Sequence, residues 1–411
     1  MAARMSVHRV AMLSVHTSPL AQPGSGDGGG MNVYVRSLAS ALTRAGVECD
    51  VLTRAEDGRW PEIVEIEPGV RVVHVRAGPA APVDKRALPG LFDEFVGAAR
   101  PHLERGSGFD ALHAHYWISG AIGHQLKHEL DVPLATTFHT LARAKRAAGI
   151  DDDVTDRFRI EREVVACSDR LIASAPDEAS QLALAYDAEA DLVEVIPPGV
   201  DHTVFFPSDQ LNARRALGLH VEGPMLLFVG RIQMLKGVDL VLECLATLPE
   251  PATLVVVGGP SGADGHAEVV RLHALADELG ITDRVRWVEP QPHEALADWY
   301  RAADVCLVPS RTESFGLVAL EAAACGTPVV AADVGGLRSL VEDGHTGFLV
   351  APRTAEAFAE PVARLLGDRV LARTMGARAA ARSGGYTWNM TAARLRRVYA
   401  DVGARELVSC T

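Results

Sequence analysis

Two carboxylates stand out as candidates for binding a polyhydroxylated ligand. Glu313 lies in a segment of turn residues, and Glu321 follows eight positions later inside the apolar run 317–324. A carboxylate in such a run needs a partner, because burying an unpaired charge is costly. Carboxylates accept hydrogen bonds from sugar hydroxyls, and one of them can bind both hydroxyls of a ribose. Glu313 also has a simpler interpretation, as a negative charge near a helix N-terminus.

The backbone that follows Glu313 is a second candidate for binding a ligand. A helix is expected to begin near Gly316, and the first N–H groups of a helix have no partner within it. Such groups bind phosphates and hydroxyls. The residues concerned are Ser314, Phe315, Gly316 and Leu317.

A pair of cations follows the strand predicted at 225–229. Arg231 comes at the end of this strand, and Lys236 lies where the next helix is expected to start. The helix dipole disfavours cations at that end, so a bound anion accounts for both residues better than an ordinary solvated surface does. Arginine and lysine at such a position suit a diphosphate.

The loop 16–32 after the first predicted strand is rich in glycine and proline. It contains a formal G-x-G-x-x-G at Gly24, Gly26 and Gly29, the pattern of dinucleotide-binding folds. The match begins about ten residues past the strand rather than in a tight turn, which disfavours a nicotinamide site. Glycines ahead of a helix instead expose backbone N–H groups to a phosphate or a sugar. We therefore expect a ligand-binding loop rather than a floppy surface loop.

Short apolar runs alternate with helical patterns along the whole chain. Many runs are continuously apolar, as in strands that helices cover on both faces. This alternation predicts parallel, doubly wound α/β sheets. The predicted strands are 10–15, 47–53, 70–75, 111–114, 134–138, 170–174, 193–196, 225–229, 253–257, 285–288, 305–308, 328–331 and 348–350. Helical patterns include 31–45, 177–186, 267–279 and 388–402.

Turn residues cluster at 197–201 and 206–209, and a new series of strands begins at 225. We therefore predict two α/β domains, at 1–204 and 205–385, and a C-terminal helix within 386–411 that is able to pack back on the first domain. Two facing domains of this kind are expected to bind ligands in a cleft, beyond the carboxyl ends of their strands.

The composition is that of a soluble globular protein, with 48% hydrophobic and 23% charged residues among 411. The net charge of −13 argues against broad binding to nucleic acid or anionic membranes. The chain has no apolar run long enough to span a membrane and no export signal, which predicts a cytoplasmic protein. The six cysteines include no C-x-x-C pair and are interpreted as scattered core thiols, not as a zinc framework or a disulfide scaffold.

These elements are more specific in combination than alone. Glu313 and Glu321 match the E-x7-E motif of the retaining glycosyltransferases of family 4, which the chain resembles over almost its whole length. Arg231 and Lys236 match that family's diphosphate-binding pair. The resemblance implies a GT-B-like fold of two facing Rossmann-like domains. It also implies that Glu321 holds the ribose of a nucleotide sugar and that Glu313 holds the sugar hydroxyls.

The loop 16–32 indicates which subgroup of family 4 the chain resembles. It is similar to that of the family 4 enzymes that move N-acetylglucosamine from UDP to D-inositol 3-phosphate in mycothiol synthesis. Lys85, Tyr116 and Thr140 match the phosphate-binding residues of this subgroup, and Arg157 completes the set if a short gap is allowed before it. These side chains also supply the donors that a phosphate monoester requires.

The resemblance implies three groups of site residues. The donor would bind to Gln22, Pro23, Gly30, Arg231, Lys236, Gln291, Glu313, Ser314, Phe315, Gly316, Leu317 and Glu321. The acceptor would bind to His16, Asp27, Gly28, Gly29, Gly30, Met31, Asn32, Lys85, Tyr116, Thr140 and Arg157. The residues at the reaction centre would be His139, Arg231, Lys236 and Glu313.

Two departures from the subgroup affect these assignments. Residues 142–160 are more similar to sucrose-phosphate synthase-type members of the family. Gln291 replaces a basic residue usually found near the donor base, which is harmless if the main chain makes that contact.

The resemblance implies front-face attack, in which the leaving phosphate accepts the acceptor's proton and no protein nucleophile is needed. A lone His139 is also compatible with a core role, but it matches the family's histidine beside the donor sugar. His113 and His115 have metal-like spacing without a third ligand, so we interpret them as structural. No cofactor is obligatory besides the UDP-sugar substrate, whereas a bound Mg²⁺ and a homodimer stay open.

Other function classes are less favoured. A nucleotide-sugar epimerase or hydrolase would not need the second phosphate site around Lys85, Tyr116 and Arg157. A non-catalytic nucleotide-sugar-binding protein would not need the whole set of cations and carboxylates. Transfer to another sugar or cyclitol phosphate is the nearest alternative.

Overall fold

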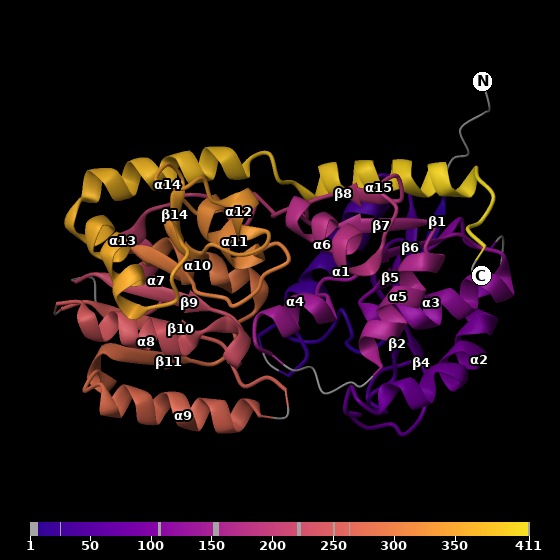
Figure 1. Ribbon diagram of the computed structural model, residues 1–411, viewed down its shortest axis with the longest axis horizontal. Helices are drawn as coiled ribbons and strands as arrows, with labels where there is room; N and C mark the ends of the chain where they lie inside the picture. The colour runs from indigo at the N-terminus through magenta and orange to yellow at the C-terminus, as the bar shows by residue number, and fades with distance from the viewer. Residues whose placement is uncertain are drawn as a thin grey trace. The chain divides into compact units, whose positions relative to one another are not determined.

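The computed structural model describes residues 7–24, 26–105, 108–150, 156–219, 223–249, 251–262 and 264–409 (Figure 1). The chain divides into two compact units. The N-terminal unit comprises Met1–Ala21, Met31–Pro197 and Trp388–Thr411. The C-terminal unit comprises Gln22–Gly30 and Pro198–Thr387.

The N-terminal unit is built on an eight-stranded sheet in the order β3-β4-β2-β1-β5-β6-β7-β8. Its central strands are short, mostly apolar and almost fully buried, as expected of strands covered on both faces. The strands are β1 (Arg9–Leu13), β2 (Glu48–Arg54), β3 (Ile63–Glu67), β4 (Val70–Val75), β5 (Ala111–His115), β6 (Leu134–Thr137), β7 (Arg170–Ala173) and β8 (Val193–Val195).

Two layers of helices cover this sheet. One face packs against α2 (Phe92–Leu103), α3 (Trp117–Leu130), α5 (Arg157–Cys167) and α6 (Pro176–Tyr186). The other face packs against α1 (Gly30–Arg44) and the C-terminal helix α15 (Trp388–Gly403), drawn in yellow beside this sheet in Figure 1. The short helix α4 (Ala142–Ala147) follows β6.

The C-terminal unit is built on a six-stranded parallel sheet in the order β11-β10-β9-β12-β13-β14. Its strands are β9 (Met225–Val229), β10 (Thr253–Val257), β11 (Val285–Val288), β12 (Val305–Val308), β13 (Val329–Ala332) and β14 (Gly347–Val350). One face packs against α7 (Gln210–Ala216), α10 (Leu296–Ala302), α11 (Leu317–Ala324) and α12 (Leu337–Leu340). The other face packs against α8 (Val238–Thr247), α9 (Gly265–Glu278), α13 (Ala355–Gly367) and α14 (Arg369–Ser383).

The predicted α/β class and every predicted strand are confirmed, with strand ends that differ by no more than about two residues. The prediction of wholly parallel sheets is wrong at one edge, where β3 pairs antiparallel with β4. The sequence analysis missed β3 because its residues alternate with charged ones and are only partly buried, as on an edge strand.

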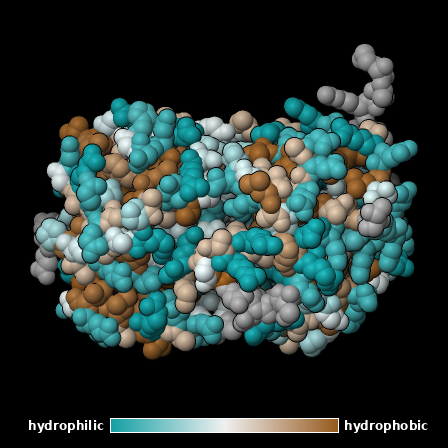
Figure 2. Space-filling view, in the orientation of Figure 1, coloured by the Kyte–Doolittle hydropathy of each residue, from teal (hydrophilic) through white to brown (hydrophobic). Residues whose placement is uncertain are grey.

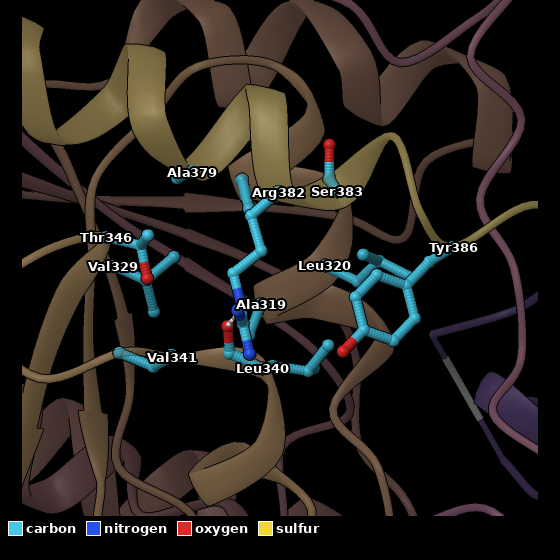
Figure 3. Close-up of a pocket in the computed structure, with 11 residues that line it drawn as sticks. Ala319, Leu320, Val329, Leu340, Val341, Thr346, Ala379, Arg382, Ser383 and Tyr386 are labelled. Atoms are coloured by element: carbon cyan, nitrogen blue, oxygen red, sulfur yellow. Dashed lines mark hydrogen bonds between the residues drawn. The ribbon is translucent and has the colours of Figure 1, made fainter.

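The surface agrees with the composition. Figure 2 shows hydrophilic and hydrophobic residues interspersed over the face that it presents. The most exposed large apolar side chains, Leu184, Val270 and Val370, lie on different helices. Within the described ranges, no helix has both the length and the apolar character needed to cross a bilayer.

Candidate active site

Strands β9 and β12 are neighbours in the C-terminal sheet, and both end in segments that carry predicted site residues. The carboxyl ends of parallel strands meet at one edge of a sheet, where ligands usually bind. Lys236, in the 3-10 turn Met234–Lys236 after β9, reaches Glu313 after β12, with 2.6 Å between Nζ and Oε2. The Ser310 hydroxyl donates to the same oxygen at 3.0 Å. Two residues 77 positions apart thus form an ion pair at the predicted edge.

Glycines fix the backbone around Glu313. Gly316 has a φ of +101° and directly precedes α11, so the predicted helix start is confirmed. The Gly336 N–H donates to the Glu313 carbonyl at 2.9 Å. A Cβ on Gly335 would lie 1.9 Å from that carbonyl oxygen, so only glycine permits this approach. The turn is therefore held by backbone contacts in a fixed position at the start of α11.

Glu321 lies in α11 with a nearly buried carboxylate, 5% exposed. Two hydrogen-bond partners offset the free-energy cost of burying this carboxylate. The His293 Nε2 lies 2.7 Å from Oε1, and the Tyr300 hydroxyl donates to Oε2 at 2.8 Å. Each carboxylate oxygen has two lone pairs, so the carboxylate keeps capacity for further hydroxyl donors. Neither partner was predicted from the sequence.

The glycine-rich segment Gln22–Gly30 groups with the C-terminal unit. The Arg231 guanidinium donates to Ser261 Oγ at 3.2 Å, and this hydroxyl donates to the Gly26 carbonyl at 2.6 Å. A Cβ on Gly29 would lie 3.0 Å from Arg231 Nε. The absence of a side chain at Gly29 therefore lets the backbone approach the cation that was predicted to bind a diphosphate.

Two predicted donor-binding residues meet although they are 269 positions apart. The Gln22 side chain donates to the main-chain carbonyl of Gln291 at 2.6 Å. The Gln291 side chain turns to its own strand end and donates to the Glu289 carbonyl at 2.9 Å. Gln291 thus presents its main chain to the segment that carries Gln22. Pro23 follows Gln22 in this segment, and a Cβ on Gly30 would lie 3.4 Å from Leu317.

Tyr116 is the centre of a cationic cluster in the N-terminal unit. The Arg157 guanidinium lies 5.0 Å from its ring centroid, and the Lys85 ammonium lies 6.0 Å from it. The His16 ring lies on the same phenol, with 4.5 Å between centroids. Burial opposes ionisation of this phenol, but the charges of Arg157, Lys145 and Lys85 outweigh it and lower the pKa of Tyr116 to about 7. The cluster is therefore suited to an anion.

Arg157 is buried and held from two sides. Its Nε lies 2.7 Å from Glu161 Oε1, one turn later on α5. Its Nη2 donates to the Thr140 carbonyl at 2.8 Å and approaches the Thr140 hydroxyl at 3.4 Å. The structure thus brings together all four residues predicted to bind the acceptor phosphate.

His139 lies at the end of β6 and is partly exposed. It is not a lone histidine, because its Nε2 lies 3.0 Å from Nδ1 of His115. Its φ of +60° is in the left-handed region, as is the φ of +79° at Tyr116. Residues other than glycine adopt this region in only a few per cent of cases, and such strain concentrates at functional sites. The two strained residues follow the adjacent strands β5 and β6.

Asn32 holds the loop after β1 in place. Its amide donates to the Thr17 hydroxyl at 2.8 Å and to the Ser18 carbonyl at 2.6 Å. The remaining predicted acceptor residues lie around it in the chain: Asp27 and Gly28 before α1, and Met31 in its first turn. The Gly28 carbonyl accepts a hydrogen bond from Gly24 N–H at 3.0 Å.

Arg54 supports the segment that carries Lys85. This arginine, at the end of β2, is 2% exposed, and its guanidinium donates to the carbonyls of Pro79 and Ala81 at 2.9 and 2.7 Å. Its nearest carboxylate, that of Glu56, lies 3.9 Å away. A buried cation paired mainly with loop carbonyls fixes the path of that loop.

One interpretation of the cysteines is wrong. Cys49, Cys244, Cys306 and Cys325 are buried free thiols as expected, but Cys167 is disulfide-bonded. Cys410 lies outside the described residues. Three residues with metal-ligand side chains lie close enough to share an ion. They are His124, His128 and Cys167, and the described residues contain no other group of three or more histidines, cysteines or carboxylates of this kind. A disulfide sulfur is not a thiolate ligand, so this group is not a metal site.

Two family models together match most of the chain. The family model named Glycosyltransferase Family 4 matches residues 28–204, and that named Glycosyl transferases group 1 matches residues 209–382. A protein of Xylanimonas cellulosilytica, named D-inositol 3-phosphate glycosyltransferase, is 48% identical over 410 residues that cover 97% of each chain. The chain belongs to glycosyltransferase family 4. A protein of the same name from Kribbella flavida is 46% identical over 94% of each chain.

Solved structures define the fold of this family 4 glycosyltransferase. Sucrose-phosphate synthase from Thermosynechococcus elongatus superposes with a TM-score of 0.90 at 34% identity, covering 96% of this chain and 98% of that one. Anabaena HepE superposes with a TM-score of 0.76 at 20% identity and covers 96% of this chain and all of its own, a likeness of fold alone. The predicted GT-B fold class is confirmed.

The sequence analysis missed residues of this glycosyltransferase whose roles depend on tertiary contacts. Lys145 adds charge at Tyr116, Arg54 holds a loop, and His293 and Tyr300 hold Glu321. Lys145 lies five residues after Thr140, so a search for further cations near a predicted phosphate ligand would have found it. The other three carry no sequence signal.

Proposed function

We propose that this glycosyltransferase moves N-acetylglucosamine from UDP to a hydroxyl of inositol 3-phosphate, with retention of configuration. The observation that carries the proposal is the cluster of Lys85, Lys145 and Arg157 around the phenol of Tyr116. A phosphate monoester carries up to two negative charges and needs several donors, which this cluster supplies. The names of the relatives, at 48% and 46% identity over nearly the whole chain, support this acceptor.

The donor is assigned to the C-terminal unit. Arg231 and Lys236 lie after β9, where they can neutralise the diphosphate of a nucleotide sugar. Glu321 has lone pairs left for the ribose hydroxyls, and Glu313 is held at the start of α11 for the hydroxyls of the sugar. The main chain at Gln291 is the proposed contact for the base.

The reaction breaks the bond between the anomeric carbon and the diphosphate oxygen, and it forms a bond from that carbon to the acceptor hydroxyl. The proton of the hydroxyl passes to the departing diphosphate. Arg231 and Lys236 stabilise the charge that develops on the diphosphate, the kind of electrostatic contribution that usually dominates. Glu313 is ion-paired with Lys236, which supports a reaction without a protein nucleophile.

Calorimetric titration in the presence of UDP tests the phosphate site. Inositol 3-phosphate is expected to bind at least about tenfold more tightly than unphosphorylated myo-inositol, since hydrogen bonds to charged groups are worth about 1.5–3 kcal/mol each. The variant Lys85→Ala should lose most of this difference. Equal affinities for the two ligands would contradict the proposal.

A sucrose-phosphate synthase-like reaction is the second candidate. The TM-score of 0.90 and 34% identity to that synthase favour it, because the acceptor of such a reaction is a sugar phosphate and would need the same phosphate-binding residues as inositol 3-phosphate. Fructose 6-phosphate in the same titration distinguishes the two. Tighter binding of fructose 6-phosphate than of inositol 3-phosphate would favour the sucrose-phosphate synthase-like reaction over the proposed one.

Replacing Glu321 with glutamine is expected to raise the KM for the UDP-sugar about ten- to hundredfold, with little change in the KM for the acceptor. The variant keeps the shape of the side chain but loses the charge that accepts hydroxyl hydrogen bonds. Initial rates at varied donor concentration measure the effect. The control is Glu268→Gln, which removes a carboxylate that pairs with Arg271 on α9. An unchanged donor KM would remove Glu321 from the ribose site.

The KM for the phosphorylated acceptor is expected to rise as the pH increases above about 7. The pKa of Tyr116 is lowered to about 7, so the phenol loses its proton in this range. The phenolate is no longer a donor, and it repels the acceptor phosphate. The pH profile of the acceptor KM measures the effect. The variant Tyr116→Phe should have a higher acceptor KM that no longer changes with pH in this range. A profile with the same slope in the variant would contradict this role.

A further inference from the structure

Three histidines lie together in the N-terminal unit, close to the candidate acceptor site. His113 and His115 are on β5, and His139 follows the adjacent strand β6. His115 Nδ1 lies 3.0 Å from His139 Nε2. His113 lies behind them, with Nδ1 at 2.7 Å from the Tyr399 hydroxyl and Nε2 at 2.9 Å from the Thr137 hydroxyl. Both nitrogens of His113 are thus satisfied by hydroxyls, whereas the hydrogen-bond contact of the His115 ring is with His139.

All three imidazoles are neutral near physiological pH. Burial lowers the pKa of His113 and of His139 to about 3 and holds the pKa of His115 well below its usual value. A neutral imidazole carries one proton, so one ring nitrogen donates and the other accepts. In the contact between His115 and His139, either ring can be the hydrogen-bond donor. Each choice of donor fixes the tautomers of both rings.

The surroundings of His115 favour one direction. Its ring is fully buried, and its Nε2 has no hydrogen-bond partner. If the proton were on this nitrogen, an N–H group would be buried without an acceptor, which is rarer in proteins than an unsatisfied acceptor. The proton therefore belongs on Nδ1, and His115 donates to His139 Nε2.

His74, on β4 of the same sheet, shows the same pattern independently. Its Nδ1 lies 2.9 Å from the Pro61 carbonyl oxygen, which can only accept, so the proton must be on Nδ1. Its Nε2 is buried and has no hydrogen-bond partner, as in His115. The same sheet thus contains a second histidine whose proton is on Nδ1 and whose buried Nε2 is unprotonated and has no hydrogen-bond partner.

We propose that His115 is a positioning residue that holds His139 as the tautomer with its proton on Nδ1. The resemblance to family 4 implies that His139 lies beside the transferred sugar, where a ring with its proton on Nδ1 is a hydrogen-bond donor and not a general base. The left-handed backbone at His139 and the edge-on ring of Tyr34, 4.9 Å away, further restrict its orientation. The role toward the sugar rests on the proposed function, but the tautomer does not.

Long-range proton–nitrogen NMR spectra of the ¹⁵N-histidine-labelled, full-length protein measure the tautomer without any substrate. The variants His115→Asn and His139→Asn assign the two signals. The expected result is the Nδ1–H form for both His115 and His139. An Nε2–H form at His139 would overturn the proposal even if the enzyme transfers sugar as proposed.

Kinetics test the consequence once the wild-type protein is shown to transfer a sugar. His115→Leu is expected to lower kcat about ten- to hundredfold, a loss similar to that seen when a metal-bound histidine loses the hydrogen-bond partner that fixes its tautomer and ring orientation. His115→Asn, whose amide can donate in place of Nδ1–H, should recover much of this loss. The control His74→Leu removes another buried histidine of the same sheet and should leave kcat unchanged. Equal kcat values for the leucine and asparagine variants would overturn the proposal, because a purely structural role does not distinguish them.

Discussion

Replacing Lys236 with methionine is expected to lower kcat about 100- to 1,000-fold while the protein stays folded. The ammonium is the cation closest to Glu313 and is proposed to stabilise the departing diphosphate, and removal of one such electrostatic group typically costs this much. Both side chains of the pair are partly exposed, so the free energy of unfolding should fall by less than about 1 kcal/mol. Glu313 keeps its hydrogen bond from Ser310 in the variant.

Steady-state rates with a UDP-sugar measure this effect. The matched control is Arg271→Met, which removes a cation paired with Glu268 on α9 of the same unit. Lys236→Arg keeps the charge and should retain more activity than the methionine variant. If Lys236→Met and Arg271→Met had similar kcat values, Lys236 would have no part in stabilising the leaving group.

Replacing Arg157 with methionine is expected to have the largest effect on stability, a loss of about 3–5 kcal/mol in the free energy of unfolding. The variant leaves Glu161 fully buried and without its cation, although Tyr186 and the Ala142 N–H still donate to it. The KM for the phosphorylated acceptor should also rise at least about tenfold, because a charged donor at the phosphate is lost.

The double variant Arg157→Met with Glu161→Gln separates these two effects. It leaves no buried unpaired charge, so urea unfolding should show that much of the stability returns while the acceptor KM stays high. Arg214→Met in the C-terminal unit is the matched control, since Arg214 is also buried and pairs with Asp304 at 2.8 Å. A double variant with a normal acceptor KM would show that Arg157 has only a structural role.

The fold was predictable because its strands are continuous apolar runs. β9 and β12 are buried along their whole length, so burial on both faces and strand identity coincide in the sequence. β3 differs in carrying two charged residues, Glu65 and Glu67, among its five, and it pairs at the sheet edge. Its pairing depends on the turn at Gly69, a local feature that a search for apolar runs does not detect.

The candidate site was predictable where strand order alone brings residues together. Lys236 and Glu313 follow adjacent parallel strands, so the expectation that strand-end loops converge was sufficient to place them at one edge. The resemblance to family 4 supplied the acceptor residues, and the structure places Arg157 against Thr140.

Contacts that depend on tertiary packing were not predictable. Tyr300 and His293 precede Glu321 by 21 and 28 residues, and no local pattern marks them as its partners. The acceptors of Arg54 are backbone carbonyls, which every residue has. The contact of His115 with His139 depends on the left-handed backbone at His139, a strained conformation that residue type does not reveal.

Mass spectrometry of the products formed from UDP-N-acetylglucosamine and D-myo-inositol 3-phosphate tests the central claim most directly. The account predicts an N-acetylglucosaminyl-inositol phosphate, formed in equal amount to the UDP released. Its anomeric configuration, read by NMR from the same sample, should be that of the donor. Release of UDP without a glycosylated inositol phosphate, or a product only with fructose 6-phosphate, would contradict it.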